Sequence, residues 1–155
     1  MLAGTLAAGG MGAVDVAAAV AAQSRAENAA DAIAHAAAAL LAADPQRGHL
    51  SIAAQAGTFC DTDSDGGPAT GDACARAMAA ARLVARENGA ILLRLTVGPD
   101  PRDLRPDRGP GRLQTLALAA VPRGLPVLPS PCPRAPGTGP DLCWAEAWSA
   151  AQEAG

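Results

Sequence analysis

The chain contains no tyrosine, one phenylalanine and two tryptophans, so aromatic residues make up only 2 % of it. It also contains no lysine, because all twelve basic residues are arginines. These absences exclude a lysine Schiff base, a Walker A lysine and a tyrosine general acid. Several common enzyme chemistries are therefore ruled out before any motif is considered.

Charged residues make up 17 % of the chain, with a formal net charge of −3. The basic patch of a nucleic-acid-binding domain and the polybasic segment of a lipid-binding surface are both lacking. Long apolar runs are lacking as well. The Ala/Gly-rich segment Leu2–Val14 is followed by Asp15, so it is shorter than a membrane-spanning helix, which needs about 20 apolar residues. A signal peptide has basic residues before its apolar segment, and no basic residue precedes this one.

What the chain has in abundance is alanine, at roughly a quarter of its residues. The length of 155 residues suits one domain. Because the larger apolar residues are few, the core of this domain must be thin. The composition therefore favours an Ala-rich, largely helical protein.

Two helices are expected. Residues Val14–Ala43 contain no Gly or Pro and are mostly Ala, which predicts a long helix that ends near Asp44-Pro45. Residues 72–89 predict a second helix, with Asp72 at its start and Asn88-Gly89 as a left-handed stop.

The segment Ala90–Val97 is the best strand candidate, with Ile91, Leu93, Leu95 and Val97 on one face. After a Pro/Arg/Asp/Gly loop, Arg112–Val121 predicts a second strand. The two strands would form an antiparallel hairpin on which the second helix packs. The expected fold class is therefore α+β.

The remaining C-terminal part divides in two. Recurring Pro and Gly in residues 122–140 predict a linker without regular structure. Residues Asp141–Ala154 predict a short helix in which Trp144 and Trp148, four residues apart, share one face. The two indoles would either form a docking stripe or cover the thin core.

The four cysteines are an even number without a C-x-x-C pair, so metal and redox sites are weakly indicated. In an exported chain they would form two disulfides, with three possible connectivities, of which the local one joins Cys60 to Cys74. In a cytosolic chain they would be free thiols. The disulfide candidates are Cys60, Cys74, Cys132 and Cys143.

An acidic loop between the two cysteines, Asp61-Thr62-Asp63-Ser64-Asp65-Gly66, matches the first half of a calcium loop. Asp72 stands at its twelfth position, where the longer Glu is usual. The loop therefore has two interpretations, a calcium site and a solvated acidic turn. The candidate metal ligands are Asp61, Asp63, Asp65 and Asp72.

No catalytic group can be assembled from the sequence alone. No serine lies in a nucleophile elbow, and neither His35 nor His49 has a second ligand at helical spacing. The glycine cluster Gly9–Gly12 follows no strand, which argues against dinucleotide binding. We therefore expect no enzymatic activity and no cofactor, apart from the calcium considered above.

Two segments carry a family resemblance. Val14–Leu41 (VDVAAAVAAQSRAENAADAIAHAAAALL) resembles the junction between the membrane helix and the exported part in TadE/TadG-like proteins of tight-adherence (Flp) pilus loci. Asp72–Val97 (DACARAMAAARLVARENGAILLRLTV) is similar to the second helix and following strand of that family. The version it looks most like is the short actinobacterial TadE-like secretion-neighbourhood protein. No prepilin-peptidase pattern precedes the apolar segment, so processing is not carried over.

The resemblance implies a non-enzymatic, membrane-anchored minor pilin or pseudopilin. Residues 1–22 would be the remnant of a membrane-anchoring helix whose translation starts upstream, and 23–121 a small exported α+β domain, followed by the linker 122–140 and the helix 141–155. Localisation would be the cell membrane, single-pass, with the bulk of the chain extracytoplasmic. Partners would be other pilus or secretion subunits, contacted through the N-terminal Ala-rich helix. The alternatives are an exported calcium-dependent binding module and a soluble Ala-rich helical protein.

Overall fold

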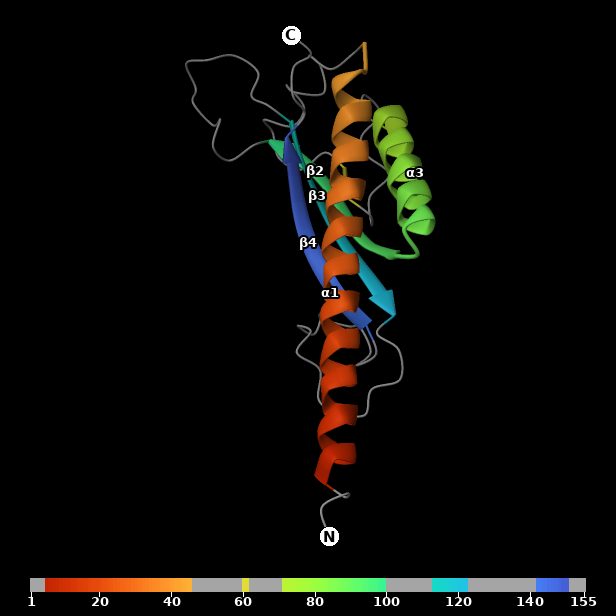
Figure 1. Ribbon diagram of the computed structural model, residues 1–155. Helices are drawn as coiled ribbons and strands as arrows, with labels where there is room; N and C mark the ends of the chain where they lie inside the picture. Colours follow the sequence, from red (N-terminus) through yellow and green to blue (C-terminus); the bar gives the residue numbers. More distant parts are fainter. Residues whose placement is uncertain (1–4, 46–59, 62–70, 100–112, 123–141, 151–155) are drawn as a thin grey trace.

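The computed structural model describes residues 5–45, 60–61, 71–99, 113–122 and 142–150. It is an α+β structure with two helices and one antiparallel sheet in these ranges (Figure 1). The helices are α1 (Thr5–Ala42) and α3 (Gly71–Glu87), and the strands are β1 (Cys60–Asp61), β2 (Ile91–Pro99), β3 (Leu113–Pro122) and β4 (Leu142–Ala150). The sheet order is β1-β2-β3-β4, so each strand pairs with its neighbour in the sequence.

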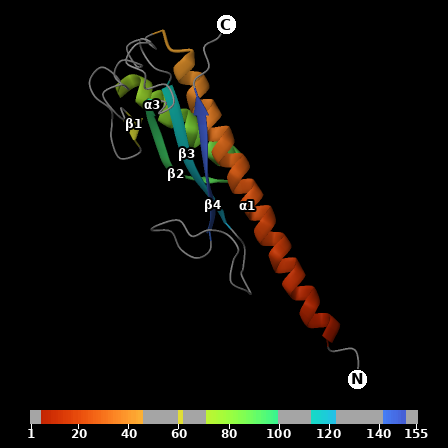
Figure 2. The same ribbon diagram turned by 90° about the vertical axis from the view of Figure 1, so that its left-hand side faces the viewer.

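Both helices pack on the sheet, α1 against β3 and β4 and α3 against β2, and they also contact each other. Seen from the side, α1 runs diagonally along the sheet, and its N-terminal part extends past it (Figure 2). The core between the helices and the sheet consists largely of alanine, with Ile33, Leu41, Leu95 and Val97 as the largest apolar side chains that are fully buried. The expectation of a thin core is thus confirmed.

Helix α1 starts earlier than the sequence predicted, at Thr5, and passes through the cluster Gly9–Gly12. Each glycine costs a helix about 1 kcal/mol relative to alanine, but propagation adds a hydrogen bond for every residue once the helix is nucleated. The predicted end is confirmed. A tightened turn, in which the Asp44 amide donates to the Leu41 carbonyl at 3.2 Å, closes the helix before Pro45.

Helix α3 ends as predicted. Gly89 has a φ of 61° and follows the last turn. The amide of Ala90 donates to the Ala85 carbonyl at 2.8 Å, and that of Gly89 donates to the Arg86 carbonyl at 3.0 Å. This pair of bonds is a Schellman arrangement, which favours glycine because left-handed backbone costs a side chain.

The predicted β2–β3 hairpin is confirmed, but the predicted facing of β2 is only partly right. Leu95 and Val97 are buried, whereas Ile91 is 49 % exposed. The register shifts between Leu92 and Arg94, so Leu93 is an extra residue in the ladder. Because a bulge adds one residue to the strand, the residues before it point to the opposite faces from those that the period of two predicts. Leu92, which the period of two assigns to the outer face, packs against the core instead.

The predicted C-terminal helix over Asp141–Ala154 is wrong, because residues 142–150 form strand β4. This strand pairs with β3 along its length, from Leu142 opposite Pro122 to Ala150 opposite Gln114. Cys143, Ala145 and Ser149 are buried, and Glu146 and Trp148 are exposed, a period of two. Pairing and burial therefore outweigh the helix propensity of this Ala-rich segment.

The predicted division of the chain also changes. Strand β4 belongs to the same sheet as β2 and β3, so it is part of the α+β domain and not a separate element. Helix α1 runs unbroken across the expected boundary after residue 22, and Ala19 and Ala22 belong to the core cluster. The expected linker lies outside the described residues, except for Pro122 at the end of β3.

Candidate functional site

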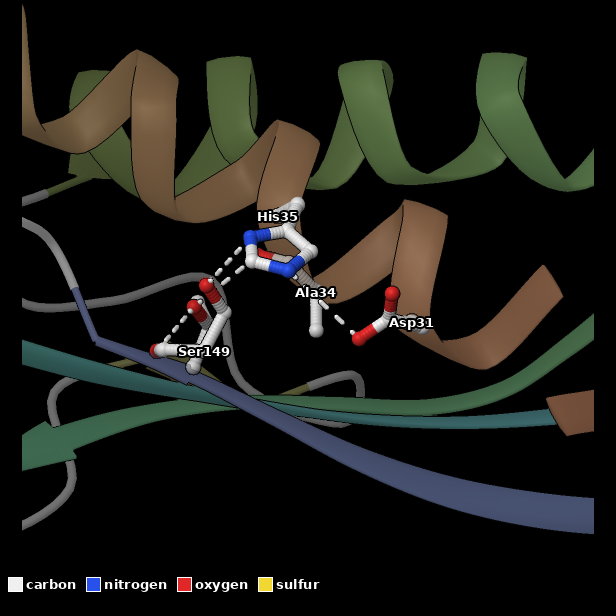
Figure 3. A network of polar contacts seen from close by, with 5 residues as sticks. Asp31, Ala34, His35 and Ser149 are labelled. Carbon is white, nitrogen blue, oxygen red and sulfur yellow. Dashed lines mark hydrogen bonds and ion pairs between the residues drawn. The ribbon is translucent and has the colours of Figure 1, made fainter. Parts of the chain in front are cut away.

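A chain of polar contacts connects α1 to the sheet (Figure 3). Its buried member is Thr115 on β3, which is 1 % exposed. The Thr115 hydroxyl lies 3.1 Å from the carbonyl oxygen of Ala34 and 3.0 Å from that of Ser149. A hydroxyl has one proton, so it donates to one of these carbonyls at a time. The contact with Ala34 shows that α1 lies close to the backbone of β3.

Ser149, His35 and Asp31 continue this chain towards the surface. The Ser149 hydroxyl lies 2.9 Å from His35 Nδ1, and His35 Nε2 lies 3.5 Å from a carboxylate oxygen of Asp31. A neutral imidazole with its proton on Nε2 would accept from Ser149 and point that proton towards Asp31. The Asp31 and His35 side chains are 62 % and 67 % exposed.

The order serine, histidine, carboxylate is that of a nucleophile with its general base. Here, however, Ser149 is only 5 % exposed, and its hydroxyl lies between β4 and α1. A substrate would have to separate the helix from the sheet to reach it. The pair formed by Asp31 and His35, one helical turn apart, is exposed to solvent, and such pairs interact only weakly. We therefore interpret the group as a structural connection between α1 and β4.

Sequence reasoning missed this connection. Ser149 and His35 are 114 residues apart, so no local pattern links them. Alternating burial in β4 is the one signal that marks Ser149, and a helical interpretation of residues 141–154 does not contain it.

Two ion pairs between arginine and aspartate connect neighbouring elements. Asp44, 7 % exposed after the end of α1, pairs with Arg76 of α3 at hydrogen-bond distance. On the opposite face of the sheet, Arg94 of β2 pairs with Asp61 of β1 at 2.7 Å. The buried Asp44 has the larger effect, because a carboxylate removed from water needs a partner.

A disulfide joins Cys60 of β1 to Cys74 of α3, as the local connectivity predicted. The sequence separation is 14, and closing such a loop stabilises a chain by about 3 kcal/mol in the chain-entropy description. Cys143 in β4 is also disulfide-bonded. Cys132 lies outside the described residues. The described cysteines are thus all oxidised, the state typical of exported proteins.

The candidate calcium ligands are only partly described. Asp61 is in β1 beside Arg94, and Asp72 is exposed in the first turn of α3. Asp63 and Asp65 lie outside the described residues, and within the described ranges no group of acidic, His or Cys residues is placed to hold a metal. Calcium binding stays a prediction, tested by a calcium-dependent rise in Tm that is lost in Asp63→Ala.

Comparison with protein-family models, curated proteins and solved structures finds no match. The resemblance to TadE/TadG-like proteins therefore depends on the two sequence segments alone. Across the part of the chain that the structure describes, no helix combines the length and apolarity needed to cross a membrane.

Proposed function

We propose that this protein is a non-enzymatic subunit of a tight-adherence pilus or a related secretion assembly, held at the cell membrane with its sheet domain outside the cytoplasm. The observation that carries the proposal is the dual use of α1. One part of the helix packs into the domain, while its N-terminal part extends past the sheet (Figures 1 and 2). A single long helix of 38 residues thus links a folded head to a protruding stem.

Two exposed valines beside the buried Ala19, where α1 leaves the domain, support this use. Val16 and Val20 are 54 % and 58 % exposed and, one turn apart, lie on the same side of α1. Around them α1 is rich in alanine. Small side chains allow helices of neighbouring subunits to approach closely, in a membrane or in a filament bundle. The stem would therefore contact partner helices, and the head would face the exterior.

The disulfides support an extracytoplasmic location. A core built mainly of alanine buries little apolar surface per residue, and a buried methylene contributes only about 0.8 kcal/mol. Cross-links compensate for such a core, but they persist only in an oxidising compartment. The Cys60–Cys74 bond is therefore of use to this fold after export.

The first experiment expresses the tagged protein from its native locus, separates cytosol, membrane and medium, and labels free thiols in each fraction. We expect membrane or cell-surface material with no labelled thiols, and cleavage by protease added from outside. Soluble cytosolic material with four labelled thiols would contradict the proposal.

A second experiment tests the stem in cells. Val16→Glu/Val20→Glu should abolish crosslinks between this protein and its partner subunits, while the head keeps its Tm. The matched control is Ser24→Glu, which adds a charge at another exposed position of α1 and should retain the crosslinks. Equal crosslinking in all variants would exclude the stem as the contact.

A further inference from the structure

The face of the sheet that points away from the helices carries large apolar side chains. Thr115 and Ser149 contact α1, so the alternate residues of β3 and β4 point outward. They include Leu116 and Leu118, half-buried, and Trp148, which is 54 % exposed. Ile91, displaced outward by the bulge in β2, is 49 % exposed. We call these residues, with Arg94 and Glu146, the outer face.

The outer face is organised in rows that cross the strands. Leu116 lies between Thr96 of β2 and Trp148 of β4, and in the next row Leu118 lies between Arg94 and Glu146. The second row therefore has an arginine at one end, paired with Asp61, an apolar centre, and a carboxylate at the other end. The Arg94 side chain is 56 % exposed although it pairs with Asp61, and Glu146 is exposed.

We propose that the outer face binds the outer face of a second copy of this chain, about a two-fold axis parallel to β3. Such an axis lies between the two sheets. It places each row of one copy over the same row of the other, with β2 of one copy opposite β4 of the other. It would place Arg94 of each copy opposite Glu146 of the other, so the interface contains this contact two times. Leu116 and Leu118 would meet their own equivalents, and Trp148 would cover Thr96. A two-fold contact is the commonest solution for soluble homo-oligomers.

The charges select this arrangement over its alternative. A two-fold axis perpendicular to the strands would keep β2 over β2 and place Arg94 opposite Arg94. That contact brings two guanidinium groups together, whereas the axis parallel to β3 places each guanidinium, with the donors that Asp61 leaves over, opposite a carboxylate. Face-to-face packing with nearly aligned strands is also the usual geometry of two sheets. The proposal holds whether or not the protein belongs to a pilus.

The size of the outer face sets the expected affinity. Three strands about 4.8 Å apart and nine residues long cover about 14 by 30 Å. This is smaller than the about 800 Å² per partner of a standard interface. We therefore expect a weak dimer, with a Kd of about 0.1 mM.

Sedimentation equilibrium of the oxidised full chain, from about tenfold below to about tenfold above that Kd, tests the proposal. Glu146→Arg should weaken dimerisation about tenfold or more, because two attractive pairs become repulsive. Trp148→Thr should weaken it as well. Glu87→Arg, the same charge change at an exposed position of α3, is the control and should leave the Kd unchanged.

A mixing experiment separates the two-fold contact from a general charge effect. Glu146→Arg mixed with Arg94→Glu should form heterodimers near the wild-type affinity, because each Arg then meets a Glu across the interface. Far-UV circular dichroism and Tm confirm that each variant is folded. A wild-type chain that stays monomeric at the highest concentration, grows beyond a dimer, or dimerises equally well in every variant would overturn the proposal.

Discussion

At the centre of β3 and β4, the two faces of the sheet divide their side chains by size in an unusual way. The face towards the helices has alanine at three positions there, Ala117, Ala119 and Ala145, whereas its large side chains, such as Leu95 and Val97, come from β2. The face away from them carries Leu116, Leu118 and Trp148. In a sheet covered on one side, the larger apolar residues are expected inside. Their presence outside fits small residues inside that serve close approach, and an outer face that takes part in the proposed dimer contact.

Close approach explains why the inner face combines alanines with hydroxyls. Thr115 reaches a backbone carbonyl of α1 with its short side chain, which requires the helix to lie near the strand. Bulky neighbours would hold the helix away. Packing and hydrogen bonding therefore depend on each other on this face, whereas the outer face has no such requirement.

The largest effect is expected when an alanine of the inner face is replaced by a larger residue. Ala117→Leu should destabilise the fold by about 3 kcal/mol or prevent folding, because Ala117 is fully buried under α1 and the added volume has no space. Urea unfolding measures the change. Ala79→Leu, the same substitution on the exposed side of α3, should cost less than about 0.5 kcal/mol. Equal effects would show that the inner face is loosely packed.

Two threonines on opposite faces of the sheet differ in whether the buried hydroxyl makes a hydrogen bond. Thr115→Val removes a buried hydroxyl that donates to a carbonyl of α1 or of β4, and should destabilise the fold by about 1 to 2 kcal/mol. Thr96 Oγ1, on the outer side of β2, is buried without a hydrogen bond to any part of the chain that the structure describes. Thr96→Val should therefore be neutral or stabilise by up to about 1 kcal/mol. Thermal unfolding of both variants decides whether the signs differ.

The smallest expected effect concerns β4. Ser149→Ala removes the hydrogen bond to His35 and should lower the free energy of unfolding by about 1 kcal/mol. Glu146→Gln, three residues earlier on the outer face, should change it by less than about 0.5 kcal/mol. Measurements at low protein concentration keep the chain monomeric. An unchanged Ser149→Ala variant would show that the polar chain to α1 contributes nothing to stability.

Local signals in the sequence predicted the elements near them. Alanine content predicted α1, and the proline after Asp44 predicted its end, because both act within one turn of the helix. Asn88-Gly89 predicted the end of α3 for the same reason, and the apolar segment after it predicted β2 and its hairpin with β3. The α+β class followed from these elements.

Tertiary structure decided the rest. Strand β4 is a strand because β3 offers it hydrogen bonds and a buried face, a long-range effect that overrides its alanine-rich composition. The bulge at Leu93 exchanged the faces of Ile91 and Leu92, and no local pattern marked it. The contact between Ser149 and His35 joins residues 114 positions apart. The local sequence set where α1 and α3 end, because a proline or a glycine stops a helix within one turn. Only the fold set which residues meet, because strand pairing and burial depend on the whole sheet.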